Sequence, residues 1–527
     1  MFSSPSRFLT ALLLSVTAIT GCRTQPLTIT VKPDQTFQTM HSFGASDCWS
    51  AQFIGQNYPL AKREQIADWL FSTEVDKAGN PKGIGLSVWR FNIGAGSTEQ
   101  GDSSSIRSPW RRSESFLLPD GSYDWTKQAG QQWFVEAAHR RKVPYLLGFT
   151  NSPPVQFTAN GKAYASGTLG DYNFNPKHLN DYARFLADVA QYFDRKGWPM
   201  HYLSPFNEPQ WDWGIKKGQK MATQEGTPAT NVDMAELTRA LSRELTTRKL
   251  ATRLTLGEAA QLNYLSQGGT NRSKTGQDDV IDAFFSPASP AFIGNLPNVE
   301  KLVCGHSYFT TSPAQTLQTV RQTLADKLAK TGVGFWQSEY CVLGDNDGEI
   351  NGNRRDLGMT TALYVAKVIH ADLTVANAAS WQWWLALSAS DYKDGLIYVE
   401  TDGKMGENKQ NAQNGDVLSS KTLWALGNYA RFVRPGMQRI AVQPMASQTA
   451  TPTPLISAYR SANKKQLVMV VVNAGDSQPI RIEGIGPKTK RIDLYETTES
   501  ADLHKRTVAF DQITLAAKSI TTLVLPL

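Results

Sequence analysis

The stretch "HYLSPFNEPQWDW", residues 201–213, carries most of the information about the fold. It begins as a short apolar run and ends in Asn207, Glu208 and Pro209, with two tryptophans beyond them. A short apolar run that stops at a proline is typical of a buried strand, so Glu208 is expected at the tip of that strand. A glutamate in this position is either a solvent-facing loop charge or a carboxylate directed into a pocket, and the rest of the chain has to distinguish the two.

Seven further apolar runs have the same character and alternate with longer amphipathic segments. They are "HSFGAS" near residue 41, "GLSVWRFNIG" near 85, "VPYLLGFTNS" near 143, "TRLTLGEAA" near 252, "EKLVCGHSYF" near 300, "GVGFWQSEY" near 332 and "AASWQWWLAL" near 378. Apolar residues recur at helical steps over 179–193, and another helix is expected from residue 127. Eight such units predict an α/β fold, the (β/α)8 TIM barrel. An open doubly wound sheet is disfavoured because no GxGxxG follows the first strands.

The sequence pattern changes at about residue 440. Short alternating stretches separated by Gly, Asn, Asp, Ser and Pro predict a C-terminal antiparallel β-sandwich. The stretch "LTITVKP" at 27–33 also alternates, and we expect this N-terminal strand to pair with the same sheet. The predicted divisions are an N-terminal segment over 22–35, a catalytic barrel over 36–438 and a β-sandwich domain over 439–527.

The N-terminus is typical of an exported protein. Arg7 precedes the apolar stretch "FLTALLLSVTAITG", which is too short to span a bilayer and fits a secretory signal. The residues "ITGC" resemble the bacterial lipoprotein cleavage box, which implies removal of residues 1–21 and lipidation of Cys22; the alternative is an ordinary signal peptide with an incidental cysteine. Lipidation would anchor the exported protein at the bacterial outer membrane, or in the periplasm or at the cell surface.

Composition excludes several classes of function. The net charge of +7 is spread over 527 residues without a basic run, so no nucleic-acid partner is expected. There is no HExxH motif and the seven histidines do not cluster, so we expect neither a metal nor a cofactor. Cys48, Cys304 and Cys341 are expected to be buried free thiols, with one disulfide as the alternative. The protein is expected to be a monomer.

Chemistry in such a barrel is expected at the C-terminal ends of the strands. The fourth strand would present Asn207 and Glu208 there, and the seventh would present Glu339. Supporting candidates are Asp47 and Trp49 after the first strand, Arg90 on the second, His306 and Tyr308 on the sixth, Trp383 on the eighth, and Trp211 with Trp213 after the fourth. Each has a structural alternative: Arg90 could pair with a structural carboxylate, His306 could be a satisfied strand-end histidine, and the tryptophans could pack in the core. Glu258, on the fifth strand, either binds a sugar hydroxyl or belongs to a structural ion pair.

Two glutamates across one pocket are what cleavage of a glycosidic bond requires. One must be protonated to give the leaving oxygen a proton, and the other must be ionised to attack the anomeric carbon. Arg90 and Tyr308 near Glu339 would favour its charged form, whereas burial and the neighbouring charge would raise the pKa of Glu208. Tryptophan side chains would supply flat apolar faces for the sugar rings.

The chain resembles glycoside hydrolase family 30, in its endo-β-1,6-galactanase-like branch. The matching pieces are "HSFGAS", "IGLSVWRFNIGAGS", "NSPPVQFTANG", "SPFNEPQ", "WQSEY" and "LGNYARFVRPG". The resemblance implies that Glu208 is the acid/base, that Glu339 is the nucleophile and that Asn207 binds the sugar 2-hydroxyl. Many members carry a tryptophan shortly after Ser-Pro-Pro, where this chain has Val-Gln-Phe at 155–157, and Trp211 and Trp213 are candidates to replace it.

These observations predict a retaining O-glycosyl hydrolase that acts on a β-linked polysaccharide or oligosaccharide. The resemblance favours endo-acting cleavage of β-1,6-galactan, with β-1,6-glucan, xylan and exo-β-glycosidase activity as alternatives. An alternative of another class is a surface glycan-binding lipoprotein that lacks turnover, because a fold does not fix a function.

Overall fold

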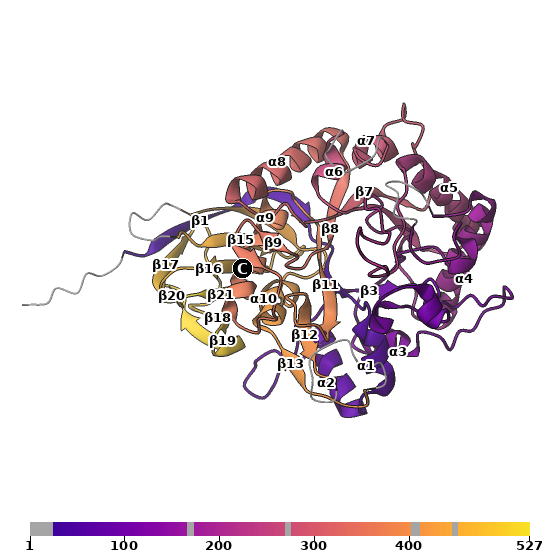
Figure 1. Ribbon diagram of the computed structural model, residues 1–527. Helices are drawn as coiled ribbons and strands as arrows, with labels where there is room; N and C mark the ends of the chain where they lie inside the picture. The colour runs from indigo at the N-terminus through magenta and orange to yellow at the C-terminus, as the bar shows by residue number, and fades with distance from the viewer. Residues whose placement is uncertain (1–24, 166–172, 269–275, 402–411, 445–451) are drawn as a thin grey trace, which may run out of the picture.

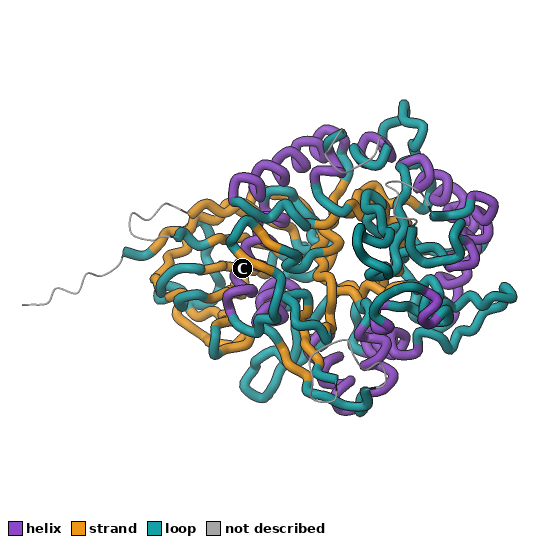
Figure 2. Tube along the Cα trace, in the orientation of Figure 1, coloured by secondary structure: helices purple, strands orange, loops and turns teal. Residues whose placement is uncertain are grey.

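The computed structural model describes residues 25–165, 173–268, 276–401, 412–444 and 452–527. The chain forms a large strand–helix body and a smaller sheet that lies against one side of it (Figure 1). In Figure 2 the helices of the large body lie around the outside of its strands, whereas the smaller body is built from strands joined by loops.

The large body is the predicted barrel. Within the described residues its parallel strands are β2 (Ser42–Ser46), β3 (Val88–Asn92), β4 (Tyr145–Phe149), β5 (Tyr202–Ser204), β6 (Arg253–Ala259), β7 (Val299–His306), β8 (Gly334–Glu339) and β11 (Ser380–Ser388). They are hydrogen-bonded in this order, and β11 pairs with both β8 and β2, which closes the ring. Each of the eight predicted apolar runs matches one of these strands, with β7 and β11 extending one residue beyond their runs, so the TIM-barrel prediction is confirmed. Two further strands, β12 (Gly395–Val399) and β13 (Val417–Ser419), extend the sheet from β11.

Helices follow the barrel strands and cover their outer face. They are α1 (Ser50–Asn57), α2 (Leu60–Phe71), α3 (Ala129–Arg140), α4 (Leu179–Arg195), α5 (Asn231–Thr247), α6 (Asn263–Ser266), α7 (Val280–Phe285), α8 (Ala314–Thr331), α9 (Met359–Thr374) and α10 (Lys421–Ala430). The helices predicted from periodicity correspond to α3 and α4. In α4 the apolar stripe, including Tyr182, Leu186 and Val189, is buried against the strands, while its polar face meets solvent. A capping box between Thr230 and Asp233 fixes the start of α5.

The barrel directs one end of every strand to a common mouth. Because the strands are parallel, residues from the C-terminal ends of β3, β5, β6, β7 and β8 meet there, although they are far apart in the sequence. Backbone conformation at the end of β6 is unusual: Gly257 has φ +105°, and a Cβ there would lie 2.7 Å from the carbonyl oxygen of Cys304. Glycine therefore allows β6 to pass close to β7 just before Glu258.

The small body is the predicted C-terminal domain, built as one nearly closed sheet. In order its strands are β19 (Ala501–Ala509), β18 (Arg491–Thr498), β21 (Ser519–Pro526), β16 (Gln466–Asn473), β15 (Leu455–Arg460), β14 (Gln438–Pro444), β1 (Leu27–Thr39), β17 (Gln478–Glu483) and β20 (Ile513–Leu515). The sheet curls around its own apolar core, which includes Ile29, Met469 and Leu523. The N-terminal strand joins it as predicted, antiparallel to β14 and parallel to β17. It runs on to Thr39, beyond the predicted end at 33, because register shifts carry the pairing past Pro33 and Asp34.

Helix α10 joins the two bodies. Its Asn428 donates hydrogen bonds to the Tyr495 carbonyl (3.1 Å) and the Thr522 hydroxyl (3.0 Å) and accepts one from Thr497 (2.6 Å), all from the C-terminal sheet. Within the described part of the chain, no helix is both long enough and apolar enough to cross a bilayer. Cys48, Cys304 and Cys341 are buried free thiols, as predicted. The predicted signal over 1–21 and the lipidation site Cys22 lie outside the described residues.

Candidate active site

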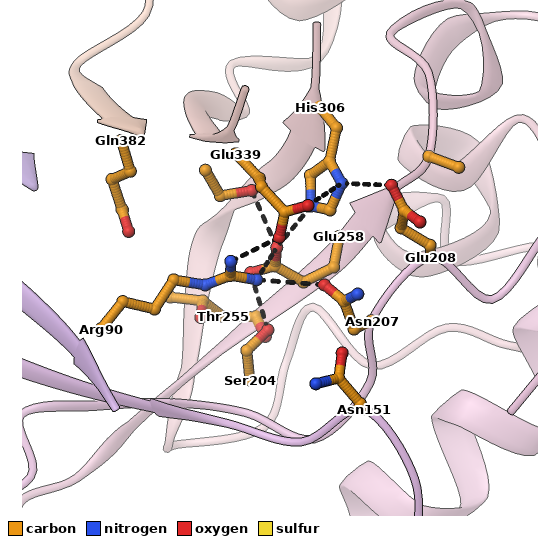
Figure 3. A network of polar contacts seen from close by, with 12 residues as sticks. Arg90, Asn151, Ser204, Asn207, Glu208, Thr255, Glu258, His306, Glu339 and Gln382 are labelled. Carbon is orange, nitrogen blue, oxygen red and sulfur yellow. Dashed lines mark hydrogen bonds and ion pairs between the residues drawn. The ribbon is translucent and has the colours of Figure 1, made fainter. Parts of the chain in front are cut away.

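The two predicted glutamates lie close together at the barrel mouth. Glu208 stands just beyond the end of β5, and Glu339 is the last residue of β8. One carboxylate oxygen from each and a ring nitrogen of His306 all lie within 4.8 Å of one another (Figure 3). The side chains of Glu208 and Glu339 are 9% and 4% exposed, so both retain limited access to solvent.

Arg90 links the residues of this site. It lies on β3, is fully buried, and donates from Nη1 to Glu339 Oε2 at 2.6 Å. Its Nη2 donates to Asn207 Oδ1 at 3.1 Å and to Glu258 Oε2 at 3.2 Å. Burial alone would lower the pKa of Arg90, but the charges of Glu258 and Glu339 raise it, so the guanidinium stays positive. Arg90 therefore contacts the candidate catalytic carboxylate of Glu339 and also pairs with the fully buried carboxylate of Glu258, so both interpretations made from the sequence hold.

His306 lies among three carboxylates. Its Nδ1–H donates to Glu208 Oε1 at 2.8 Å and its Nε2–H to Glu258 Oε2 at 3.1 Å, while Nδ1 is 3.6 Å from Glu339 Oε1. Burial alone would lower the pKa of His306, but the charge of Glu339 and the hydrogen bonds to the other two carboxylates raise it to about 10. At neutral pH the imidazole is therefore a second buried cation beside Arg90.

Glu258 is a structural anion beneath the pair. It accepts hydrogen bonds from Ser204 (2.9 Å) and Ser338 (2.8 Å) in addition to those from Arg90 and His306. Burial opposes its ionisation, but the Arg90 charge and the His306 hydrogen bond outweigh that effect and hold the pKa of Glu258 at about 2. The ion-pair interpretation is favoured over binding of a sugar hydroxyl, because these contacts occupy both carboxylate oxygens.

The two mouth glutamates have different surroundings. Burial raises the pKa of Glu208, with a further increase from the charge of Glu339, while the His306 hydrogen bond acts in the opposite direction. Glu339 instead accepts hydrogen bonds from Arg90 and from the hydroxyl of Tyr308 (3.0 Å). Burial thus favours a proton on Glu208, whereas a guanidinium and a hydroxyl both donate hydrogen bonds to the carboxyl group of Glu339.

The backbone holds the segment around Glu208 in place. The amide of Glu208 donates to the carbonyl of Glu258 at 2.9 Å, and both residues have positive φ angles, 46° and 40°. The carbonyl of Glu208 accepts from the Trp211 amide (3.1 Å) and the Trp213 indole (2.9 Å). Left-handed backbone at non-glycine residues is uncommon and clusters at functional sites.

Asp47 and Trp49, which were predicted after the first strand, are both buried. Asp47 is buried against β3, where its Oδ1 accepts from the Asn92 amide at 2.8 Å, and burial raises its pKa to about 8. Trp49 is 5% exposed, lies 5.0 Å from the Arg111 guanidinium and meets Trp384 edge-on at 5.4 Å. Within the described residues, Asp47 Oδ2 and the Trp49 indole nitrogen have no hydrogen-bond partner, so neither side chain is bonded to a glutamate of the site.

The two adjacent tryptophans of β11 have different surroundings. Trp383 is 1% exposed, and its indole donates to the Asp394 carbonyl at 2.7 Å, so it is packed rather than presented to a ligand. Its neighbour Trp384 is half-buried. Trp211, in the loop beyond Glu208, is also half-buried and meets the exposed ring of Phe309 edge-on. Trp211 and Phe309 therefore form an aromatic pair that is more exposed than Trp383.

Two serines that support the site were missed by sequence analysis. Ser204 and Ser338 both hydrogen-bond Glu258, and both lie inside apolar runs that had already been identified as strands. A polar side chain in a strand that is otherwise buried is the signal that could have identified them.

Glu208, His306 and Glu339 also offer three potential metal ligands. However, His306 already donates to Glu208, and Glu339 already accepts from Arg90 and Tyr308. The positive charges that balance the carboxylates come from Arg90 and the protonated imidazole. This donor set fits an acid–base site, and we assign no metal to it.

The chain is similar to known proteins in sequence and in fold. The profile of O-glycosyl hydrolase family 30 matches residues 26–398. The fold is similar to that of a conserved exported protein from Bacteroides fragilis, with 34% identity, a TM-score of 0.86, and coverage of 94% of this chain and 100% of that one. The catalytic domain of xylanase C from Talaromyces cellulolyticus is 21% identical, with a TM-score of 0.64 over 95% of this chain and 100% of that chain.

A curated relative is similar over a short stretch. An exo-β-1,6-galactobiohydrolase from Bifidobacterium longum is 28% identical over 99 residues, which are 18% of this chain. The match spans only 6% of the length of that protein.

Proposed function

The chain belongs to O-glycosyl hydrolase family 30, and we propose that it cleaves β-linked glycans with retention of anomeric configuration. The observation that carries this proposal is the spacing of the two carboxylates, whose nearest oxygens lie within 4.8 Å of each other. Retaining glycosidases place their carboxyl groups about 5–5.5 Å apart, whereas inverting enzymes separate them by about 6.5–9.5 Å to admit water. The close pair supports a double displacement.

In the first step, Glu339 attacks the anomeric carbon and forms a glycosyl ester as the bond to the leaving oxygen breaks. Glu208 gives its proton to that oxygen. Arg90 and Tyr308 orient Glu339 for this attack, because both donate hydrogen bonds to its carboxylate. Asn207 uses its amide oxygen to accept from Arg90, which leaves its amide hydrogens for a sugar hydroxyl.

In the second step, Glu208 acts as a base. It takes a proton from a water molecule whose oxygen bonds to the anomeric carbon, while the ester to Glu339 breaks and the free carboxylate returns. Glu208 must therefore change protonation state twice in each cycle. Its raised pKa and its contact with His306 support this role, since groups that exchange protons work best with a pKa near the operating pH.

For the substrate we favour β-1,6-galactan, cut internally. The support is the sequence resemblance in the strand-two and "NSPP" segments, together with the partial similarity to an exo-β-1,6-galactobiohydrolase. β-1,6-Glucan, xylan and exo-acting cleavage are the alternatives. A monomer would suffice, since the residues of the site all come from one chain.

Product analysis tests this function. Residues 23–527 and the Glu208→Gln variant would be incubated with β-1,6-galactan, β-1,6-glucan and xylan, and the anomers released would be followed by proton NMR. We expect short oligosaccharides from one polymer, released first as the β-anomer, and none with the variant. Binding of a polymer without any product would support instead the glycan-binding lipoprotein.

We also place the protein outside the cytoplasm, on a lipid anchor at Cys22. The N-terminal sequence supports this, as does the similarity to an exported protein of Bacteroides fragilis. Expression in a Gram-negative host tests the anchor by fractionation: wild type should appear in membranes, and Cys22→Ser should move to the soluble exported fraction. Equal distribution of the two would contradict lipidation.

A further inference from the structure

An exposed phenylalanine stands directly beside the candidate active site. Phe309 follows β7 and is 47% exposed, although its neighbour Tyr308 is buried and hydrogen-bonded to Glu339. Large apolar side chains with this degree of exposure are few among the described residues: Phe37, Leu60, Val75, Val232, Phe309 and Leu343. A single exposed apolar residue needs no explanation by itself, so the case for Phe309 rests on where it is held and at what cost.

The backbone of Phe309 is in a strained conformation. Its φ is +57°, in the left-handed region that bulky residues rarely adopt. Such a conformation persists only when the surroundings impose it, and it is concentrated at functional sites. Glycine would adopt this φ without strain, so a phenylalanine here is not explained by the stability of the turn.

The ring of Phe309 meets the segment that carries the acid/base. It lies edge-on to Trp211, with centroids 6.1 Å apart and an interplanar angle of 84°. The amide of Trp211 in turn donates to the carbonyl of Glu208. The two rings therefore form a partly exposed aromatic pair tied to Glu208 on one side and, through Tyr308, to Glu339 on the other.

We propose that Phe309 and Trp211 form the platform for the sugar on the leaving-group side of the bond being cut. This inference rests on the proposed function. The acid must lie beside the leaving oxygen, and that oxygen belongs to the departing sugar. Groups fixed to the backbone of Glu208 are therefore next to the departing ring, and aromatic faces bind the apolar C–H face of a pyranose. The platform therefore binds a sugar residue of the substrate chain. It makes the enzyme prefer substrates with a glycosyl leaving group over substrates with a small leaving group.

Two substrates separate this role from the rest of catalysis. A glycosyl fluoride has no sugar on its leaving side, and fluoride departs as an anion without needing a proton. A polymer must place a sugar there before it can react. We would measure kcat/KM for β-1,6-galactan and for the β-fluoride of β-1,6-galactobiose, with β-1,6-glucan and β-gentiobiosyl fluoride run in parallel.

The main variant is Phe309→Gly, which removes the ring and suits the backbone. We expect the ratio of polymer to fluoride kcat/KM to fall on the order of tenfold, the scale of one apolar contact in a binding site. Phe309→Tyr should restore the ratio, because it keeps the ring. The Phe309→Gly protein should melt at or above the wild-type temperature, since strain is relieved.

The matched control is Phe37→Ala, which removes a ring of 43% exposure from β1, on the C-terminal sheet, and should leave the ratio unchanged. An unchanged ratio in Phe309→Gly, or a marked loss of its melting temperature, would overturn the platform and leave Phe309 as a packing residue. A wild-type protein that turns over none of these polymers and fluorides would instead overturn β-1,6-glycan cleavage as the proposed function, and this inference with it.

Discussion

The imidazole of His306 donates a 2.8 Å hydrogen bond to the carboxylate of Glu208, the residue proposed to give and take the catalytic proton. Burial raises the pKa of Glu208, and the His306 hydrogen bond and charge oppose that increase. The protonation of the acid/base therefore depends on the balance of these two effects, and His306 is the residue through which it can be changed.

Substitution of His306 should move the alkaline limb of the pH–rate profile. That limb of kcat/KM reports loss of the proton from Glu208 in the free enzyme. Without the neighbouring cation the pKa of Glu208 rises further, so in His306→Gln the limb should move to higher pH by roughly one to three units, the usual effect of one close charge. Initial rates on an aryl β-glycoside from pH 4 to 10 would measure this shift. His306 of the wild type has a pKa of about 10, so it is still about half protonated at the upper end of this range.

The control for this experiment is His139→Gln, on the exposed face of α3, which should leave both limbs in place. An alkaline limb that is unchanged in His306→Gln, or that moves to lower pH, would show that His306 does not set the proton affinity of Glu208.

Azide should distinguish the two glutamates by the stereochemistry of its product. In Glu339→Ala the azide ion can take the space of the lost carboxylate and attack opposite the leaving group, so a β-glycoside with a good leaving group should give the α-glycosyl azide. In Glu208→Ala the glycosyl ester still forms, and azide then attacks it from the face that the leaving group vacated, which gives the β-glycosyl azide.

Anomeric coupling constants in proton NMR identify the two azides. Without azide, Glu208→Ala should lose activity on the polymer by on the order of 10²–10⁴-fold, the usual contribution of a general acid. If both variants gave the same anomer, the assigned roles would be cancelled. If Glu208→Ala gave the α-azide and Glu339→Ala the β-azide, the two roles would be exchanged.

Glu258 should make the folded protein sensitive to acid. Its pKa is about 2 in the folded chain against an ordinary value of 4.5, so the folded state binds its proton more weakly than the unfolded state does. The resulting stabilisation, about 3 kcal/mol at most, is present above pH 4.5 and is lost as the pH falls towards 2. Glu258→Gln cannot make this contribution and leaves Arg90 and His306 with one anion fewer, so its free energy of unfolding at pH 7 should fall by about 3–5 kcal/mol.

Urea unfolding at pH 3, 5 and 7 would test this prediction. The difference between wild type and Glu258→Gln should shrink as the pH falls. Glu74→Gln, which removes an exposed partner of Lys82, is the matched control and should leave the curve unchanged. A difference that is constant across the three pH values would mean that the pKa of Glu258 is the same in the folded and unfolded states, which would contradict the prediction.

The barrel could be predicted from the sequence because its strands are buried on both faces. Such strands appear as short continuous apolar runs, and each of the eight matched a strand. Glu208 and Glu339 could be placed for the same reason, since each ends a run. The charge balance around Glu258 could not be predicted, because four separate strands bring Arg90, His306, Ser204 and Ser338 to it. Only their register in the closed ring decides which cation meets which carboxylate.

The tryptophans of β11 show a second limit. Adjacent residues of a strand face opposite sides, so one of Trp383 and Trp384 should face the mouth. However, the pairing of β11 with β2 shifts register between Trp383 and Leu385, which breaks the alternation at the position in question. A bulge of this kind leaves no mark in the local sequence.

Trp383 should therefore behave as a structural residue, in contrast to Trp211. Trp383→Phe loses the indole bond to the Asp394 carbonyl in a site that is 1% exposed, so the free energy of unfolding should fall by about 1–3 kcal/mol. Its KM for the polymer should change little in the fraction that stays folded. Trp211→Ala removes a half-buried ring beside the acid/base and should raise KM with a small effect on stability. Urea unfolding and steady-state kinetics on both variants give the comparison, and a raised KM with unchanged stability in Trp383→Phe would return Trp383 to the sugar-binding surface.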